Sequence, residues 1–340
     1  MPDRPGPPRD YGDLAGLLRE ATQRTPFGQA PGKSGATLER VIIRGQPYVL
    51  KRLDLAEDWT MRAAGCLRGA PFELWQRGIL RRLPRCFNQP IVSVAIQTPA
   101  GPAPSGGCDL LMRDVSSWLV PATDDPIPRA QHARFLRHMA ALHASFWGGG
   151  ADLDVVPVAH RYLELSPWMA QAEASLGSSH LVPKLVAEGW PRLAEVAPAA
   201  AAIAGPLALD PGPLVEALAH TPQTFVHGNW KLDNLGTDDR GRTVLLDWEV
   251  PGLGAPLSDL AWYLAINCRR LPASKEASIA AYRGALTAHG IDTEPWFDRQ
   301  LALCLLGALV QFGWEKALGG YDDELRWWER HAGQAAALLG

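Results

Sequence analysis

Residues 227–234 read HGNWKLDN, and this stretch decides how the rest of the chain is interpreted. It follows a short apolar run, Thr224-Phe225-Val226, and a second such run begins at Thr243. A loop with this spacing of histidine, lysine and asparagine, set between two short strands, is typical of a phosphoryl-transfer site. The third position, where such a loop keeps a carboxylate base, holds the amide Asn229.

The composition of the 340-residue chain is that of a soluble globular protein with room for two lobes, since 47% of the residues are hydrophobic and 20% are charged. A net charge of −3 gives no electrostatic reason to expect nucleic acid or an anionic membrane as a partner. The most apolar run, 301–310, is shorter than a bilayer span, and the N-terminal MPDRPGPPRD lacks an apolar signal core. We therefore expect a cytoplasmic protein with a flexible leader, and the oligomeric state stays open.

The first third of the chain is rich in strand signals. Four apolar-polar runs predict the strands of a small sheet: 38–44, 48–53, 90–97 and 108–112. Gly45-Gln46 between the first two runs predicts a hairpin turn. The apolar positions from Pro71 to Leu83 predict one helix beside this sheet.

The remainder of the chain has mainly helical periodicity. Apolar side chains recur on one helical face at Phe135, Met139, Leu142 and Phe146, and further helical patterns begin at Ser258, Ser274, Pro295 and Asp322. The fold class that follows is α+β and bilobal, of the protein-kinase-like kind. We expect residues 1–30 to form the leader and the start of the N-lobe, 31–113 the β-rich N-lobe, and 114–340 the helical C-lobe that carries the catalytic loop and the acceptor site.

Two oxygen-bearing side chains, Asn234 and Asp247, are candidates for metal ligands. Between them lie Leu235-Gly236-Thr237, a turn over residues 238–241, and a strand from Thr243 to Leu246. A hairpin over these residues would bring Asn234 and Asp247 close together. Mg²⁺ prefers such oxygen ligands and is commonly held by one or two carboxylates together with substrate phosphates.

Cationic and backbone groups for the phosphates are candidates in the N-lobe. Lys51 interrupts an apolar strand, and Glu73 begins the helix that follows; together they match the ion pair that positions phosphates in kinases. Taken singly, each has an ordinary interpretation, as an edge-strand charge and as a favourable helix-terminal acid. The stretch Gly32-Lys33-Ser34-Gly35 precedes the hairpin and could cover the phosphates with backbone N–H groups, although it lacks the Walker A spacing.

In these residues the chain resembles the aminoglycoside phosphotransferase family of small-molecule kinases. The resemblance extends from about Gly32 to the C-terminus and is closest to an actinobacterial branch whose loop reads H-G-D-W-K-x-G-N-L-G. The segments that match are the loop at 227–236, LLDW at 245–248, SDLA at 258–261, LLMRDV at 110–115 and LHASFW at 142–147. The resemblance implies a hinge near residues 113–115 and contacts to the nucleotide base from Met112, Arg113 and Val115. It also implies ATP or GTP, with Mg²⁺, as cofactors.

Two positions depart from that loop. Asn229 stands where the family has its catalytic aspartate, and Asp233 stands where the branch has glycine. An amide orients a hydroxyl but accepts no proton as a base. Lys231 could still stabilise charge on the transferred phosphoryl group, and Asp233 could supply the missing carboxylate from four residues away.

The favoured hypothesis is a phosphotransferase that acts on a hydroxyl of a small molecule, such as an aminoglycoside-like or other sugar-containing metabolite. The alternatives are a silent nucleotide-binding pseudokinase that acts through a partner, and a kinase of Ser or Thr in a natural-product precursor peptide. His227 is expected to hold the loop by hydrogen bonds, and His143 to be a packed core residue.

Overall fold

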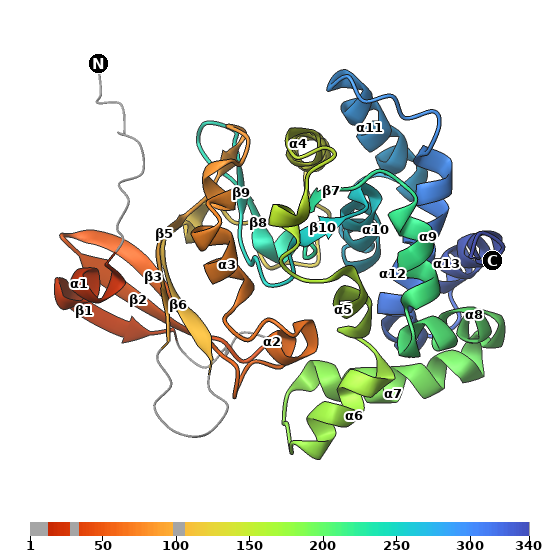
Figure 1. The fold of residues 1–340 in the computed structure, drawn as a ribbon, viewed down its shortest axis with the longest axis horizontal. Coiled ribbons are helices and arrows are strands. Elements are labelled where there is room, and N and C mark those ends of the chain that lie inside the picture. The colour runs from red at the N-terminus through yellow and green to blue at the C-terminus, as the bar shows by residue number, and fades with distance from the viewer. Residues whose placement is uncertain (1–12, 28–33, 98–105, 340) are drawn as a thin grey trace.

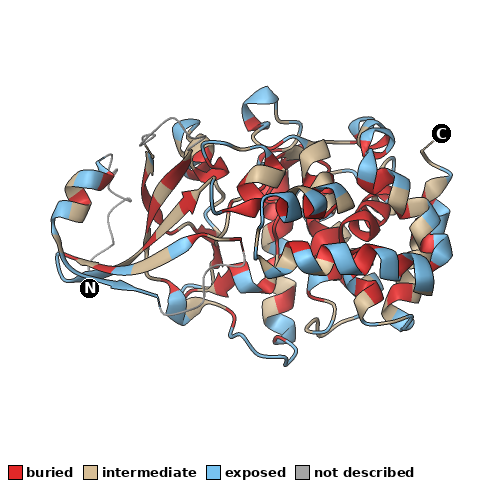
Figure 2. Cartoon of the chain, turned by 90° about the horizontal axis from the view of Figure 1, so that it is seen from below, coloured by how far each residue is buried: buried red, intermediate tan, exposed pale blue. Residues whose placement is uncertain are grey.

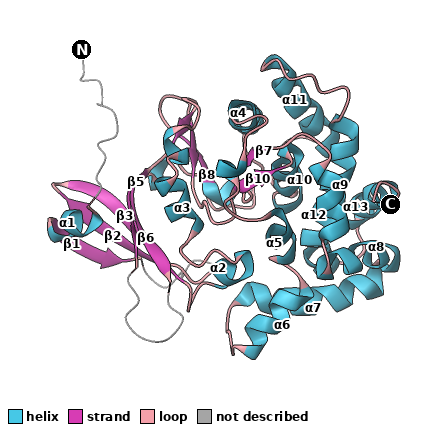
Figure 3. Cartoon of the chain, viewed as in Figure 1, coloured by secondary structure: helices cyan, strands magenta, loops and turns pink. Residues whose placement is uncertain are grey.

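The structure, a computed structural model, describes residues 13–27, 34–97 and 106–339. Strands gather at one end of the molecule and helices at the other, with the loop at 227–234 between them (Figures 1 and 3). The predicted α+β class, with a β-rich N-lobe and a helical C-lobe, is confirmed. The predicted leader at MPDRPGPPRD lies outside the described residues.

The N-lobe is built on a five-stranded antiparallel sheet of order β1-β2-β3-β6-β5. Its strands are β1 Ala21–Pro26, β2 Thr37–Ile43, β3 Gln46–Asp54, β5 Ile91–Ile96 and β6 Gly107–Arg113. The predicted hairpin is confirmed, but its turn is formed by Arg44 and Gly45, one position earlier than expected. Both turn residues have positive φ, 50° and 72°, as the tight two-residue turn between twisted strands requires.

The helix predicted from Pro71 to Leu83 is wrong in its length. The structure has α3 Ala70–Gln76, then a separate 3₁₀ turn, η1 Ile79–Arg81. Gly78 lies between them in the left-handed conformation, φ 68°, which ends an α-helix because the next residue turns away from its axis. Two short helices, α1 Leu14–Arg19 and α2 Trp59–Ala64, and the short strand β4 Phe87–Asn88 complete the lobe and were not predicted.

The C-lobe is a helical assembly around one long helix. Its helices are α4 Arg129–Ser145, α5 Val158–Leu163, α6 Pro167–Ser175, α7 Leu181–Val196, α8 Pro198–Leu209, α9 Gly212–Ala219, α10 Pro256–Ile266, α11 Lys275–Ala288, α12 Phe297–Leu318 and α13 Asp323–Ala336. By length and composition α12 could cross a bilayer, yet 78% of its apolar window is buried in the protein. It packs against α7, α8, α10 and α13, where buried residues concentrate (Figure 2). Its apolar surface is therefore core.

Short strands carry the loop at 227–234. β7 Thr224–Val226 pairs with β10 Gly252–Gly254, and β8 Leu235–Thr237 forms the predicted hairpin with β9 Thr243–Leu245. The β4 strand of the N-lobe pairs in parallel with β9, which ties the two lobes together beside the loop. The loop is thus anchored at both ends by backbone hydrogen bonds.

Candidate active site

His227 holds the start of the loop as a neutral imidazole. Its Nε2–H donates to the carbonyl oxygen of Leu246 at 2.9 Å, and its Nδ1 accepts from the backbone N–H of Asn229 at 3.1 Å. These contacts assign the tautomer, because one nitrogen must carry the proton and the other a lone pair. Burial lowers the pKa of His227 to about 4, so the ring stays neutral. The loop-holding role expected for His227 is confirmed.

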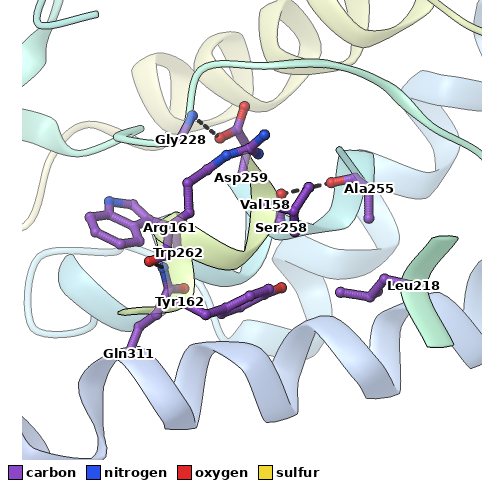
Figure 4. Close-up of a pocket in the computed structure, with 10 residues that line it drawn as sticks. All are labelled: Val158, Arg161, Tyr162, Leu218, Gly228, Ala255, Ser258, Asp259, Trp262 and Gln311. Atoms are coloured by element: carbon purple, nitrogen blue, oxygen red, sulfur yellow. Dashed lines mark hydrogen bonds between the residues drawn. The ribbon is translucent and has the colours of Figure 1, made fainter. Parts of the chain in front are cut away.

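Asp259, in the first turn of α10, fixes the loop from behind. Its carboxylate accepts from the backbone N–H groups of His227 at 2.8 Å and Gly228 at 2.7 Å, and from Nε2 of His143 at 3.1 Å. Burial opposes its charge, but the hydrogen bond from His143 and the loop N–H groups hold the pKa of Asp259 below its usual value. Figure 4 shows Asp259 beside Gly228 and Arg161, around a cavity of about 20 Å³ that has room for one water molecule. Asp259 is therefore a scaffold carboxylate.

The structure brings Asn229, Asn234 and Asp247 together at the end of the β8–β9 hairpin. The Asn234 side-chain nitrogen donates to the Asn229 carbonyl at 3.0 Å, and the backbone N–H of Leu246 donates to the Asn234 carbonyl at 2.9 Å. The Asn229 amide nitrogen lies 3.5 Å from an Asp247 carboxylate oxygen. Asp247 itself is left-handed, φ 67°, a conformation that aspartate tolerates better than most residues.

Lys51 of β3 reaches across to the residues that follow β9. Its Nζ contacts a carboxylate oxygen of Asp247 and lies 2.6 Å from one of Glu249. The predicted ion pair between Lys51 and Glu73 is not formed. Glu73 instead pairs with Arg68 at 3.3 Å and Arg77 at 3.6 Å, because these arginines lie beside it along the same chain segment and Lys51 already has two carboxylates. Glu249 was not singled out from the sequence, although it stands two residues after Asp247.

Lys51, Asp247 and Glu249 shift one another's pKa values. Burial opposes the charge of Lys51, but the carboxylates of Asp247 and Glu249 outweigh it and raise the pKa of Lys51. Burial also opposes the charge of Asp247, yet the two lysines Lys51 and Lys231 lower its pKa well below the usual range. Burial and the charge of Asp247 raise the pKa of Glu249. Asp247 is therefore the carboxylate that stays ionised and available to a cation.

A cavity of about 270 Å³ lies between the sheet of the N-lobe and the β9 segment. Its walls are mainly apolar, from Ala36, Leu38, Val49, Ile91, Leu110, Met112, Val115, Leu119 and Leu245. Arg113 also lines it, and its guanidinium donates to the Asn88 side chain at 2.6 Å. The polar end holds Lys51, Asn234 and Asp247. A narrow apolar chamber with one charged end suits a planar base with attached phosphates.

A second cavity of about 500 Å³ opens from the same polar end toward the helical lobe. Four aromatic side chains line it: Trp59, Trp262, Phe312 and Trp314. Its acidic groups are Glu164, Asp233, Asp247, Glu249 and Glu315, and its basic groups are Lys51, Lys231 and Arg270. Asn229 also lines this cavity. The two cavities share Lys51, Asn234, Asp247 and Glu249, so a group bound in one can meet a group bound in the other.

Glu164, at the C-terminal end of α5, was not predicted from the sequence. It is 7% exposed, and its Oε2 is buried with no hydrogen-bond partner among the described residues. Burial raises its pKa to about 7, while the charge of Lys231 opposes the shift. A helix-end glutamate far from the loop in sequence carries no local signal that would have found it.

The phosphate-covering stretch predicted at residues 32–35 is only partly described. Gly32 and Lys33 lie outside the described residues. The Ser34 carbonyl accepts from the backbone N–H of Trp59 at 3.1 Å, and Ser34 lines the second cavity. Gly35 has φ 112°, and a Cβ there would meet a backbone carbonyl, so glycine is required.

The residues at the polar end fit a magnesium ion bound with nucleotide phosphates. No group of three or more His, Cys, Asp and Glu side chains that could hold a metal occurs within residues 13–27, 34–97 and 106–339. An ionised Asp247 beside Asn234 offers the small oxygen set that Mg²⁺ uses when phosphates and water complete its shell. The donor set thus suits a metal that arrives with its substrate.

These features define a class, namely a two-lobed protein in which a loop, a lysine and two oxygen-bearing side chains meet where two cavities join. A sequence model of the phosphotransferase enzyme family matches residues 113–296, slightly more than half of the chain. The chain belongs to the phosphotransferase enzyme family. A search of curated proteins finds no match.

Several solved structures have a similar arrangement. A thermostable mutant of aminoglycoside phosphotransferase APH(4)-Ia, in a ternary complex with ADP and hygromycin B, is 14% identical over 96% of this chain and 97% of that chain, with a TM-score of 0.46. Choline kinase LicA from Streptococcus pneumoniae is 13% identical over 95% and 96%, with a TM-score of 0.48. Macrolide 2′-phosphotransferase type I is 16% identical over 93% and 90%, with a TM-score of 0.45. Because these identities are low, the family assignment depends on the match at residues 113–296.

The first prediction concerns Gly228. It has φ 77°, and a Cβ there would press against the carbonyl oxygen of Val250. Gly241 has nearly the same φ, 72°, but a Cβ there would meet nothing closer than 3.9 Å. Gly241→Ala should therefore cost only the left-handed penalty of about 1–2 kcal/mol, and Gly228→Ala distinctly more. Chemical denaturation of both variants measures the difference; equal losses would show that the close approach is unimportant.

The second prediction concerns Glu164. Because burial raises its pKa from 4.5 to about 7, the folded state binds this proton more tightly than the unfolded chain does. Glu164 therefore lowers stability progressively as the pH rises from about 4.5 to about 7. Glu164→Gln removes this effect and should raise the free energy of unfolding by up to about 3 kcal/mol above pH 7, at ~1.4 kcal/mol per pKa unit.

Denaturation curves at pH 5 and pH 8 test this second prediction. The exposed Glu188 of α7 supplies the matched control, Glu188→Gln. The gain should grow with pH in the Glu164 variant and stay absent in the control. A gain that does not change with pH would contradict the buried, titrating state of Glu164.

Proposed function

We propose that the protein transfers the γ-phosphoryl group of ATP, with Mg²⁺, to a hydroxyl of a small molecule. The observation that carries the proposal is the shared polar end of the two cavities, where Lys51, Asp247 and Asn234 lie between a nucleotide-sized chamber and an acceptor-sized one. Family membership supports phosphoryl transfer as the chemistry. The apolar chamber beside residues 112–115 is proposed for the base, which makes this segment the hinge between N-lobe 31–113 and C-lobe 114–340.

The proposed roles follow from charge and position. Lys51 and Lys231 place positive charge at the polar end, where it would offset negative charge on the transferred group. Asn234 and Asp247 would hold Mg²⁺, which supplies further charge neutralisation when bound. Asn229 would orient the acceptor hydroxyl through its amide. Because ATP is abundant in the cytoplasm, we place the protein there.

The second cavity supports an acceptor with both apolar faces and polar or basic groups. Aromatic walls cover the faces of a ring and attract cations, and carboxylates attract amines. The carboxylates of Glu164 and Asp233 and the indole of Trp262 are among the side chains that line it. An amino- or hydroxyl-bearing sugar-like molecule suits this lining.

A second candidate function is a nucleotide-binding protein without transfer activity. Asn229 in place of the expected carboxylate is the observation that favours it. Mg²⁺-dependent ATP turnover separates the two functions, since a silent protein would bind the nucleotide and leave it intact.

A third prediction tests the metal ligand. Asparagine, like aspartate, tolerates the left-handed backbone conformation at position 247, and Lys51 stays paired with Glu249. The Asp247→Asn variant should therefore keep its fold. Losing a charged ligand should weaken Mg²⁺-dependent ATP binding by about 10–100-fold or more. Thermal shift with ATP, with and without Mg²⁺, is the measurement. Asp239→Asn, an exposed change in the β8–β9 turn, is the control. Undiminished stabilisation of the Asp247 variant by Mg-ATP would refute the assignment.

The fourth prediction tests the strand lysine. Lys51→Ala removes one charge-assisted contact to a phosphate, worth ~1.5–3 kcal/mol, or about 10–100-fold in ATP affinity. The free protein should also lose stability, because Asp247 and Glu249 would lose their shared counter-ion. Calorimetric titration with Mg-ATP measures the affinity directly, beside Lys184→Ala on the exposed face of α7. If both variants bind equally well, Lys51 is no phosphate contact.

A further inference from the structure

The transfer reaction releases a proton from the acceptor hydroxyl, and Asn229 cannot take it. A carboxylate elsewhere in the acceptor cavity would have to be ionisable, close to the polar end and not already committed to a cation. Asp247 and Glu249 share Lys51, and Glu315 pairs with Lys316 at 2.8 Å. Of the other two acidic side chains of the cavity, the buried Glu164 meets these conditions better than the exposed Asp233, which has interactions of its own.

The surroundings of the Glu164 carboxyl destabilise the folded protein. It is more than nine-tenths buried, it lines the acceptor cavity, and its Oε2 has no hydrogen-bond partner among the described residues. Buried carboxyl oxygens without partners destabilise a fold, so they are rare unless a ligand completes them. Because the Glu164 side chain also lines the acceptor cavity, a donor bound there can approach its carboxylate.

Glu164 lines the same cavity as Asn229, Lys231 and Asp247. The groups whose charges act on it are Lys231, Asp58 and Asp247, and the other ionisable groups of the cavity are Lys51, Asp233, Glu249, Arg270 and Glu315. Lys231 belongs to the loop, two residues after Asn229, and Asp247 lies against the Asn229 amide. Burial raises the pKa of Glu164 to about 7, where a carboxylate both exists at neutral pH and binds a proton well.

We propose that Glu164 is the general base of the transfer reaction and replaces the carboxylate that position 229 lacks. This inference depends on the proposed phosphotransferase function. The acceptor oxygen forms its bond to the γ-phosphorus with its own electron pair. The bond from that phosphorus to the β–γ bridging oxygen breaks, and its electron pair leaves with ADP. The acceptor proton passes to the carboxylate of Glu164 and then to solvent, while Asn229 orients the hydroxyl.

Asp233 is the weaker candidate for this role. It is exposed, in contrast to the buried Glu164, so water competes with an acceptor hydroxyl for its carboxylate. It lies in the η4 turn, Leu232–Asn234, and the Asn234 side chain beside it donates to the backbone carbonyl of Asn229. The test therefore includes Asp233→Asn as the competing variant.

Mg-ATP hydrolysis tests the proposal without knowledge of the acceptor, because water then takes the place of the alcohol. Glu164→Gln should lower kcat by about 10²-fold or more, with little change in KM for ATP. The ratio of native to variant rates should increase as the pH rises through about 7. Glu188→Gln, a matched change on the exposed face of α7, should leave kcat unchanged.

A double-mutant cycle with Asn229→Asp gives a sharper test. Once the loop carries its own carboxylate, adding Glu164→Gln should cost little, so the two changes should be strongly non-additive. A purely structural role for Glu164 predicts the same loss in both backgrounds.

Three results would overturn the proposal. They are equal rates for native protein and Glu164→Gln, a larger loss in Asp233→Asn than in Glu164→Gln, and a native protein that is silent while Asn229→Asp is active. None of these three results contradicts the proposed phosphotransferase function, provided that the native or the Asn229→Asp protein binds Mg-ATP and turns it over. Absence of Mg-ATP binding and turnover in both proteins would overturn the proposed function itself.

Discussion

The contact of Lys51 with Asp247 and Glu249 is the interaction on which the site depends. Lys51 belongs to the sheet of the N-lobe, and both carboxylates follow β9 at the edge of the helical lobe. One ammonium therefore fixes the polar end at which the two cavities meet. Because it cannot neutralise two carboxylates fully, their pKa values move apart, with Asp247 lowered and Glu249 raised. Asp247, which lines both cavities together with Asn234, is the one that stays charged.

A second set of contacts holds the loop without taking part in the chemistry. Asp259 accepts from two consecutive loop N–H groups, and His227 bridges the loop to the β9 segment through Leu246. Asp259 and His227 are buried and Gly228 and Leu246 are half-buried, so these hydrogen bonds are costly to break. The reacting side chains can therefore be arranged on a short, irregular loop that has little secondary structure of its own.

Local signals in the sequence were sufficient for the parts of the site that lie within one hairpin or one turn. Gly45 marked the β2–β3 turn, and the spacing from Asn234 to Asp247 marked the β8–β9 hairpin that brings them together. Partnerships between distant elements could not be predicted in this way. The lysine on β3 could pair with any nearby acid, and the sequence alone favoured Glu73, whereas folding places Asp247 and Glu249 closer and gives Glu73 two arginines.

No pattern in the sequence indicated Glu164 either, because its surroundings come from elements that are distant along the chain. A glutamate at the end of a short helix has an ordinary interpretation as a solvated charge, and no periodicity marks it as buried. Its environment arises only when α5 packs against α2, α12 and β10. Burial, lack of a hydrogen-bond partner and access to a cavity are properties of the folded chain, and their combination is what distinguishes Glu164 from the exposed acids of the surface.

The amide at position 229 also has a physical consequence for its neighbours. A carboxylate there would be the third at this end of the site, next to Asp247 and Glu249, and like charges at such distances raise one another's pKa values. Asn229 instead turns a donor toward Asp247 at 3.5 Å, which leaves Asp247 ionised for a cation. Under the proposed mechanism the base stands on α5, a different element from the metal ligands. Proton acceptance and metal binding are then separated between a buried and a half-buried carboxylate whose pKa values the fold moves in opposite directions, Glu164 upward and Asp247 downward.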